Sequence, residues 1–158
     1  MPLTDEHQYS IEALAKNEDA IGDLYTTYAR LIPDHGNFWS RMVDEERGHA
    51  IWLRRLIESV EDGEMKLDKD RFDLSTIDRS IDHINNLEKE AVAKGIEILN
   101  AVSNALVVEN SLLERKFFEI YDGDSDEVKR ILTNLEKAAR EHRDRVAQFL
   151  DDLKSDLN

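Results

Sequence analysis

The sequence predicts an all-α protein of long helices, and three observations support this fold class. Only 6 of its 158 residues are glycine and 2 are proline, which leaves few residues for the tight turns that strands need. Charged residues make up 35% of the chain and hydrophobic residues 41%. The hydrophobic residues recur every three or four positions, as on the buried face of a helix. The length matches a single domain over residues 1–158 with one core.

A short turn joins the first two predicted helices. Hydrophobic spacing predicts a helix over residues 8–32. Pro33 ends it, because the residue before a proline disfavours helical backbone angles. The polar segment 34–37 then supplies a turn, and a second helix is predicted over 38–60. Because the turn is short, we expect the two helices to be antiparallel neighbours.

A long connection follows the second helix. Residues 61–73 are mostly charged or polar, and a short helix is predicted over 76–92. Ser75 and Asp78 resemble a capping box, in which two side chains bond the first backbone N–H groups of a helix. A connection of about 35 residues with a helix inside it is long enough to return along the bundle.

Two further long helices are predicted after Gly95, which breaks the preceding helix. They cover residues 96–121 and 126–153, and Ser125 is the expected N-cap of the last one. Two antiparallel helix pairs joined by one long connection have the connectivity of a ferritin-like four-helix bundle. The sequence therefore predicts such a bundle, with a short extra helix in its long crossover.

Composition and charge exclude several classes of function. A chain without cysteine forms no disulfide, thiolate zinc site or iron–sulfur cluster, so any metal needs oxygen and nitrogen ligands. A net charge of -14 repels nucleic acids and anionic lipids. No hydrophobic run approaches the roughly 20 residues that span a bilayer. We therefore expect a soluble, cytoplasmic protein with neither a nucleic-acid nor a membrane partner.

Five ionisable residues fall on the hydrophobic faces of the four long predicted helices. Such a cluster of charges in a protein interior needs compensation, and two divalent cations would supply it. Glutamate and histidine suit iron, manganese and zinc, and Glu-x-x-His projects both groups from one helix face. The two predicted helix pairs also match in spacing: His49 follows Glu18 by 31 positions, and His142 follows Glu109 by 33. The predicted ligands are Glu18, Glu46, His49, Glu109 and His142.

The same positions carry a resemblance to a known family. The matching stretches are Glu18 with Tyr25, the run 44–50 (DEERGHA), Glu109, and the run 138–142 (AAREH). On these, the chain resembles the rubrerythrin-like branch of the ferritin-like superfamily over essentially its whole length. The resemblance implies a di-iron carboxylate site, with a glutamate from two helices and Glu-x-x-His from the other two. It also implies a homodimer.

One ligand position departs from the family pattern. Ala139 stands where the second Glu-x-x-His would begin, so one bridging carboxylate is missing. The cysteine-rich electron-transfer module of the family is missing too. We expect two iron ions, or one if the second half-site is empty, with manganese or zinc as alternatives. Open coordination positions would bind oxygen or peroxide, with Tyr25 as a catalytic hydrogen-bond or electron donor.

Two functions stay open from the sequence alone. One is a non-haem di-metal protein with oxygen- or peroxide-dependent oxidoreductase activity, which the five retained ligand residues favour. The other is a ferritin-like scaffold whose metal centre has decayed and which acts as a binding or structural homodimer, which Ala139 favours. Trp52 and Phe118, expected to be exposed on the bundle flanks, could form the dimer interface.

Overall fold

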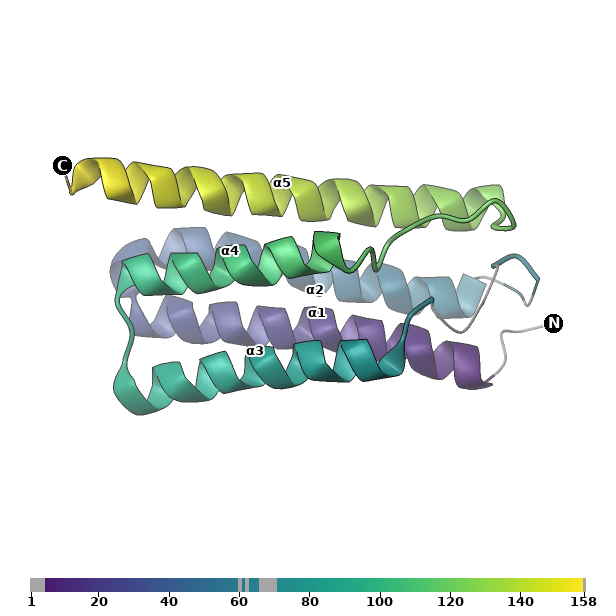
Figure 1. Ribbon diagram of the computed structural model, residues 1–158, viewed down its shortest axis with the longest axis horizontal. Helices are drawn as coiled ribbons and strands as arrows, with labels where there is room; N and C mark the ends of the chain where they lie inside the picture. Colours follow the sequence, from purple (N-terminus) through teal and green to yellow (C-terminus); the bar gives the residue numbers. More distant parts are fainter. Residues whose placement is uncertain (1–4, 60, 62, 66–70, 158) are drawn as a thin grey trace.

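The computed structural model describes residues 5–59, 61, 63–65 and 71–157, and it confirms an all-α fold (Figure 1). The ends of the first, second and last long helices lie within about three residues of the predicted ones. The elements of the described residues are α1 (Asp5–Leu31), the 3-10 helix η1 (Pro33–His35), α2 (Gly36–Ser59), α3 (Leu74–Lys94), α4 (Ile98–Glu114) and α5 (Asp126–Asp156).

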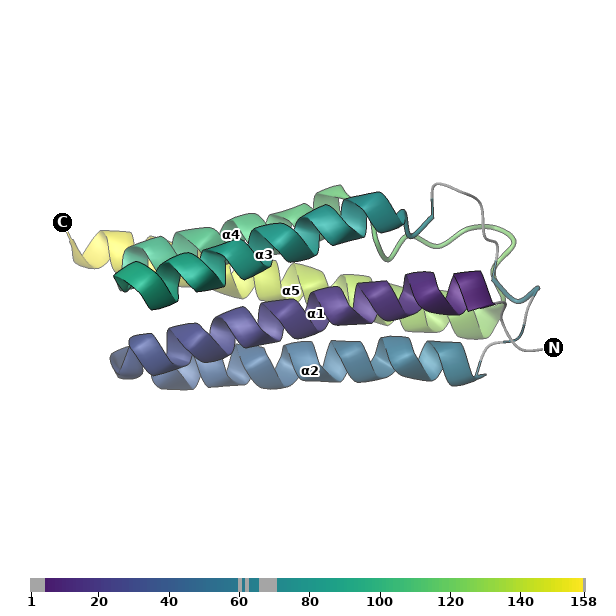
Figure 2. The ribbon, with the colours of Figure 1, turned by 90° about the horizontal axis from the view of Figure 1, so that it is seen from below.

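The helices lie nearly parallel to one long axis and alternate in direction along the chain (Figure 1). Helices α1 and α2 form one antiparallel pair, and α4 and α5 form a second. Helix α3 lies beside α1 and carries the chain back along the length of the bundle (Figure 2). Helices α2 and α5 also touch, but they pack less closely than the two antiparallel pairs do.

The connecting helix differs from the prediction in length and in its cap. Helix α3 has 21 residues, so it is a long helix and not a short one. Its N-cap is Asp73, whose carboxylate accepts hydrogen bonds from Ser75 N at 3.3 Å and Thr76 Oγ1 at 2.7 Å. The predicted capping box of Ser75 and Asp78 is therefore wrong. Gly95 ends the helix at a φ of 74°, which confirms the predicted break.

Helix α4 ends earlier than predicted, at Glu114 and not near residue 121. The chain turns at Lys116, which adopts a left-handed φ of 54°. This turn directs Phe117 and Phe118 back into the core, so the expectation that Phe118 is exposed is wrong. Trp52, the other predicted flank residue, is 39% exposed.

The non-helical connections are tied together by a buried ion pair. Arg71 donates to both carboxylate oxygens of Asp124, at 2.6 and 2.7 Å, and to the carbonyl of Glu119 at 3.0 Å. The following Ser125 caps α5, as predicted, by accepting from Val128 N at 3.2 Å. The segments before α3 and before α5 therefore hold each other in place at one end of the bundle.

No helix of the described ranges is long and apolar enough to cross a membrane.

Candidate metal centre

The five predicted ligands all lie on the buried faces of their helices. Helix α1 supplies Glu18, α2 supplies Glu46 and His49, α4 supplies Glu109, and α5 supplies His142. The three carboxylates are fully buried, and His49 is the most exposed of the five at 9%. The structure thus brings together one or two ionisable side chains from each of four helices.

Glu46 lies at the middle of this cluster. Its Oε1 is 2.9 Å from Nδ1 of His142, and its Oε2 is 3.3 Å from Nδ1 of His49. The two other carboxylates lie further out, with Glu18 Oε2 3.9 Å from His49 Nδ1 and Glu109 Oε1 3.9 Å from His142 Nδ1. One donor atom each from Glu46, His49 and His142 lies within 4.8 Å of the others. Three donor atoms at this spacing could hold a metal ion.

Several oxygens of the cluster have no hydrogen-bond partner although they are buried. They are both carboxylate oxygens of Glu18, Oε2 of Glu46 and Oε2 of Glu109. A buried carboxylate oxygen without a donor is costly, and buried polar groups are almost always satisfied. Metal cations are the partners that such carboxylate oxygens bind, so the residues present fit a metal site.

The protonation of the cluster compensates its charge in the absence of metal. Burial raises the pKa of the carboxyls of Glu18 and Glu109 well above the usual range, and the charge of Glu46 adds to both shifts. Burial works against ionisation of Glu46 as well, but its contacts with Glu18, His142 and His49 outweigh this and keep its pKa below the usual range. For His49, burial is outweighed by Glu18 and Glu46, which raise its pKa to about 11. Without metal, the surroundings therefore favour the protonated forms of Glu18, Glu109 and His49 over their deprotonated forms.

Metal binding at this site is expected to release protons and to strengthen as the pH rises. An ion that binds His49 must displace a proton at neutral pH, because the pKa of this imidazole is raised to about 11. Burial, which raises the pKa of the Glu18 and Glu109 carboxyls, makes their protons compete with the metal as well. Each displaced proton makes the affinity rise about tenfold per pH unit. Titration calorimetry in buffers of different ionisation enthalpy measures the number released, and we expect more than one per ion at pH 7. An affinity independent of pH would contradict this protonation pattern.

Tyr25 touches the cluster through its hydroxyl group. The O–H donates to Oε1 of Glu109 at 2.8 Å. Burial, with the charge of Glu109 second, raises the pKa of Tyr25 well above its usual value, so the phenol keeps its proton. Tyr28 lies one turn further along α1, where its oxygen accepts from Asn104 Nδ2 at 3.2 Å. Tyr25 therefore orients one ligand of the centre, and its catalytic role stays a prediction.

Sequence reasoning missed Glu45, which holds the second imidazole of the centre. Its carboxylate accepts a hydrogen bond from Nε2 of His142, and also from Arg145 Nη1 at 2.8 Å and Arg41 Nε at 3.1 Å. With Nε2 occupied, His142 presents Nδ1 to the cluster, as metal-binding histidines do when a second residue orients them. One feature of the sequence points to this contact: Arg145, which shares the carboxylate with His142, follows that histidine by three positions on the same face of the helix.

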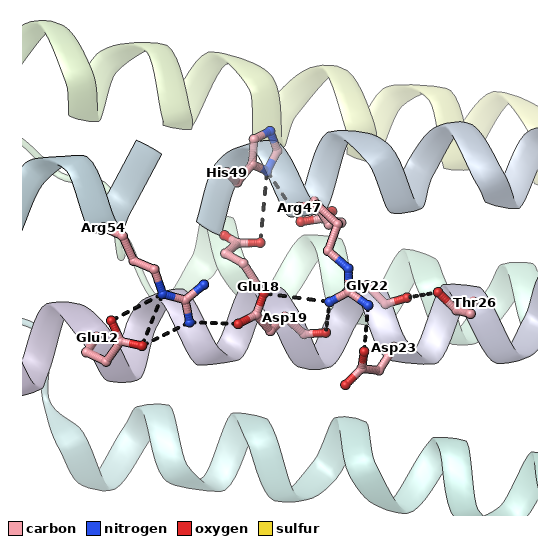
Figure 3. A network of polar contacts seen from close by, with 10 residues as sticks. Glu12, Glu18, Asp19, Gly22, Asp23, Thr26, Arg47, His49 and Arg54 are labelled. Carbon is pink, nitrogen blue, oxygen red and sulfur yellow. Dashed lines mark hydrogen bonds and ion pairs between the residues drawn. The ribbon is translucent and has the colours of Figure 1, made fainter. Parts of the chain in front are cut away.

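Two arginines of α2 fix its register against α1 on either side of the centre (Figure 3). Arg47 donates to the carbonyl of Asp19 at 3.0 Å and to the carboxylate of Asp23 at 2.6 Å. Arg54 donates to Glu12 at 2.9 Å and to the carboxylate of Asp19 at 2.7 Å. These pairs flank the carboxylate of α1 and the imidazole of α2 that face each other in the cluster. They therefore help to set which residues of the two helices meet.

The donor set limits which ions fit. Carboxylate and imidazole groups suit iron, manganese and zinc. Ala139, which is 2% exposed on α5, adds no donor, so the five candidate ligands would leave coordination positions open on a bound ion.

Comparison with known proteins identifies no relative. The chain matches no protein-family model, no curated protein and no solved structure.

Proposed function

We propose that this protein is a ferritin-like bundle that binds two divalent metal ions, preferably iron, and supports oxidoreductase chemistry with oxygen or peroxide. The observation that supports this most directly is a group of five buried ionisable side chains from four helices, with four buried carboxylate oxygens that accept no hydrogen bond. Two antiparallel helix pairs joined by a helix that returns along the bundle also agree with ferritin-like connectivity.

Glu46 would bridge the two ions, because its two oxygens face different imidazoles. One ion would take Glu18 and His49 as its further ligands, and the other would take Glu109 and His142. Three carboxylates leave one positive charge on two divalent ions, which a small anion from solvent would balance. The second ion has only the half-site next to Ala139, so we expect it to be held more weakly.

Bound iron supplies one-electron redox chemistry with oxygen or peroxide. The chain's own residues would bind the ions, and their burial keeps water away from the three carboxylates. Tyr25, whose hydroxyl donates a hydrogen bond to Glu109, would be the donor of a proton or an electron. Glu45 holds the ring of His142 in one orientation.

The test is a titration of metal-free protein with Fe²⁺ without oxygen, followed by addition of oxygen or peroxide. We expect tight binding of one ion, weaker binding of a second, and consumption of the oxidant by the loaded protein. Cobalt substitution adds a visible spectrum that reports on nitrogen and oxygen ligands. The control is His83→Ala, which removes an exposed histidine of α3 and should bind the ions as the unchanged protein does. Folded protein that takes up no ion under these conditions would remove the proposal.

The alternative function is a metal-free scaffold that acts as a structural homodimer. Ala139 favours it, because the residue leaves the ligand set incomplete. Ile51 and Trp52, which are adjacent on α2 and are 51% and 39% exposed, provide a surface for such a dimer. Sedimentation together with metal analysis separates the two functions: a stable dimer that binds no metal would support the scaffold.

A further inference from the structure

A groove of about 450 Å³ lies between α2 and α5 and reaches the candidate centre. Both imidazoles of the centre, His49 and His142, line it. It lies where these two helices pack less closely than the antiparallel pairs. We propose that this groove binds a small, neutral aromatic molecule, which is the organic substrate of the centre.

The size and walls of the groove fit an organic molecule. Oxygen or peroxide needs far less space, whereas small-molecule sites have about 300–1,000 Å³. Trp52, which is partly exposed, offers an indole ring, and Leu135 and Ala138 add an apolar wall from α5. An aromatic ring packed on these residues would direct its substituent toward the imidazoles.

The charges along the groove favour a neutral ligand. Its two arginines, Arg41 and Arg145, both donate to Glu45, so this carboxylate offsets part of their positive charge. With Glu141, the groove has two acidic and two basic side chains whose formal charges cancel. His49, which also lines it, is paired with the carboxylate of Glu46 at 3.3 Å. The net charge of -14 on the whole chain also repels anions.

Gly48 keeps the groove open beside His49. A Cβ added at this position would meet no atom within 4 Å, and Gly48 lines the groove, so a larger side chain here would take up part of its volume. Glycine is otherwise a poor residue for the interior of a helix. Gly48→Leu is therefore expected to fill the groove while it favours the helix. Gly36→Leu is the control, because that glycine is equally unobstructed and is the first residue of α2, outside the groove lining.

The test is a titration of metal-free protein with 4-methylphenol, followed by NMR of the two tryptophan indole N–H groups. We expect the Trp52 signal to shift and saturate in the millimolar range. The Trp39 signal should stay in place, since that side chain is fully buried. Gly48→Leu should weaken binding at least about tenfold, with unchanged helix content by circular dichroism, and Gly36→Leu should bind as the unchanged protein does.

Three results would overturn the proposal: no saturable shift of Trp52, unchanged binding in Gly48→Leu, or equal or tighter binding of benzoate or benzylamine. The role of the ligand as a substrate rests on the proposed function, but its binding is measured without metal. Protein that binds 4-methylphenol and no metal would therefore refute only the proposed function. Protein that binds metal and no 4-methylphenol would refute only this inference.

Discussion

Glu46→Gln is expected to abolish tight metal binding. Glu46 is the one carboxylate of the centre with an oxygen near each imidazole, at 2.9 Å from His142 and 3.3 Å from His49. Glutamine keeps the shape but replaces one oxygen with an NH₂ group and removes the charge. Loss of a residue that merely orients a ligand weakens metal affinity about 10- to 100-fold. Loss of the bridging ligand should weaken it by about 100-fold or more, which titration followed by elemental analysis measures.

A matched substitution separates this effect from a general change in the helix. Glu58→Gln makes the same chemical change at an exposed position of α2, where no ion is expected. It should leave both affinity and stoichiometry unchanged. Thermal unfolding of the metal-free proteins shows whether Glu46→Gln still folds. If the folded variant keeps its metal, the ions bind elsewhere in the chain.

The helices were largely predictable because their hydrophobic residues repeat at helical spacing. The exception is the end of α4, where the same spacing continues through Phe117 and Ile120 although the helix has ended. Periodicity does not reveal a turn at a residue such as Lys116, whose left-handed backbone depends on the packing of the following phenylalanines.

The ligand cluster could be found from the sequence because a charged residue on a hydrophobic face contradicts the helical pattern. Glu18, Glu109 and His142 each stand out in this way. Glu45 does not, because it lies beside the buried face, and its partners His142 and Arg145 come from a helix about 100 positions later in the chain. The groove between α2 and α5 also depends on how two distant helices pack, which a single sequence does not specify.

Ala139→Glu is expected to complete the second half-site. Ala139 is 2% exposed and lies three residues before His142 on α5, on the same face of the helix. Without metal, a further buried carboxyl has no partner there, so the melting temperature of the metal-free variant should fall. With Fe²⁺ or Mn²⁺, the new carboxylate should bind the second ion and raise its affinity about tenfold or more.

The sign of the stability change distinguishes a metal ligand from an ordinary substitution in the core. A ligand present at 100 times its dissociation constant stabilises the folded state by about 2.7 kcal/mol, so metal should raise the melting temperature of Ala139→Glu more than that of the unchanged protein. Ala139→Gln has nearly the same volume without the charge and should lose stability without gaining an ion. If Ala139→Glu and Ala139→Gln respond to metal alike, position 139 does not face the ions, and the pairing of Glu109 with His142 as a second half-site is wrong.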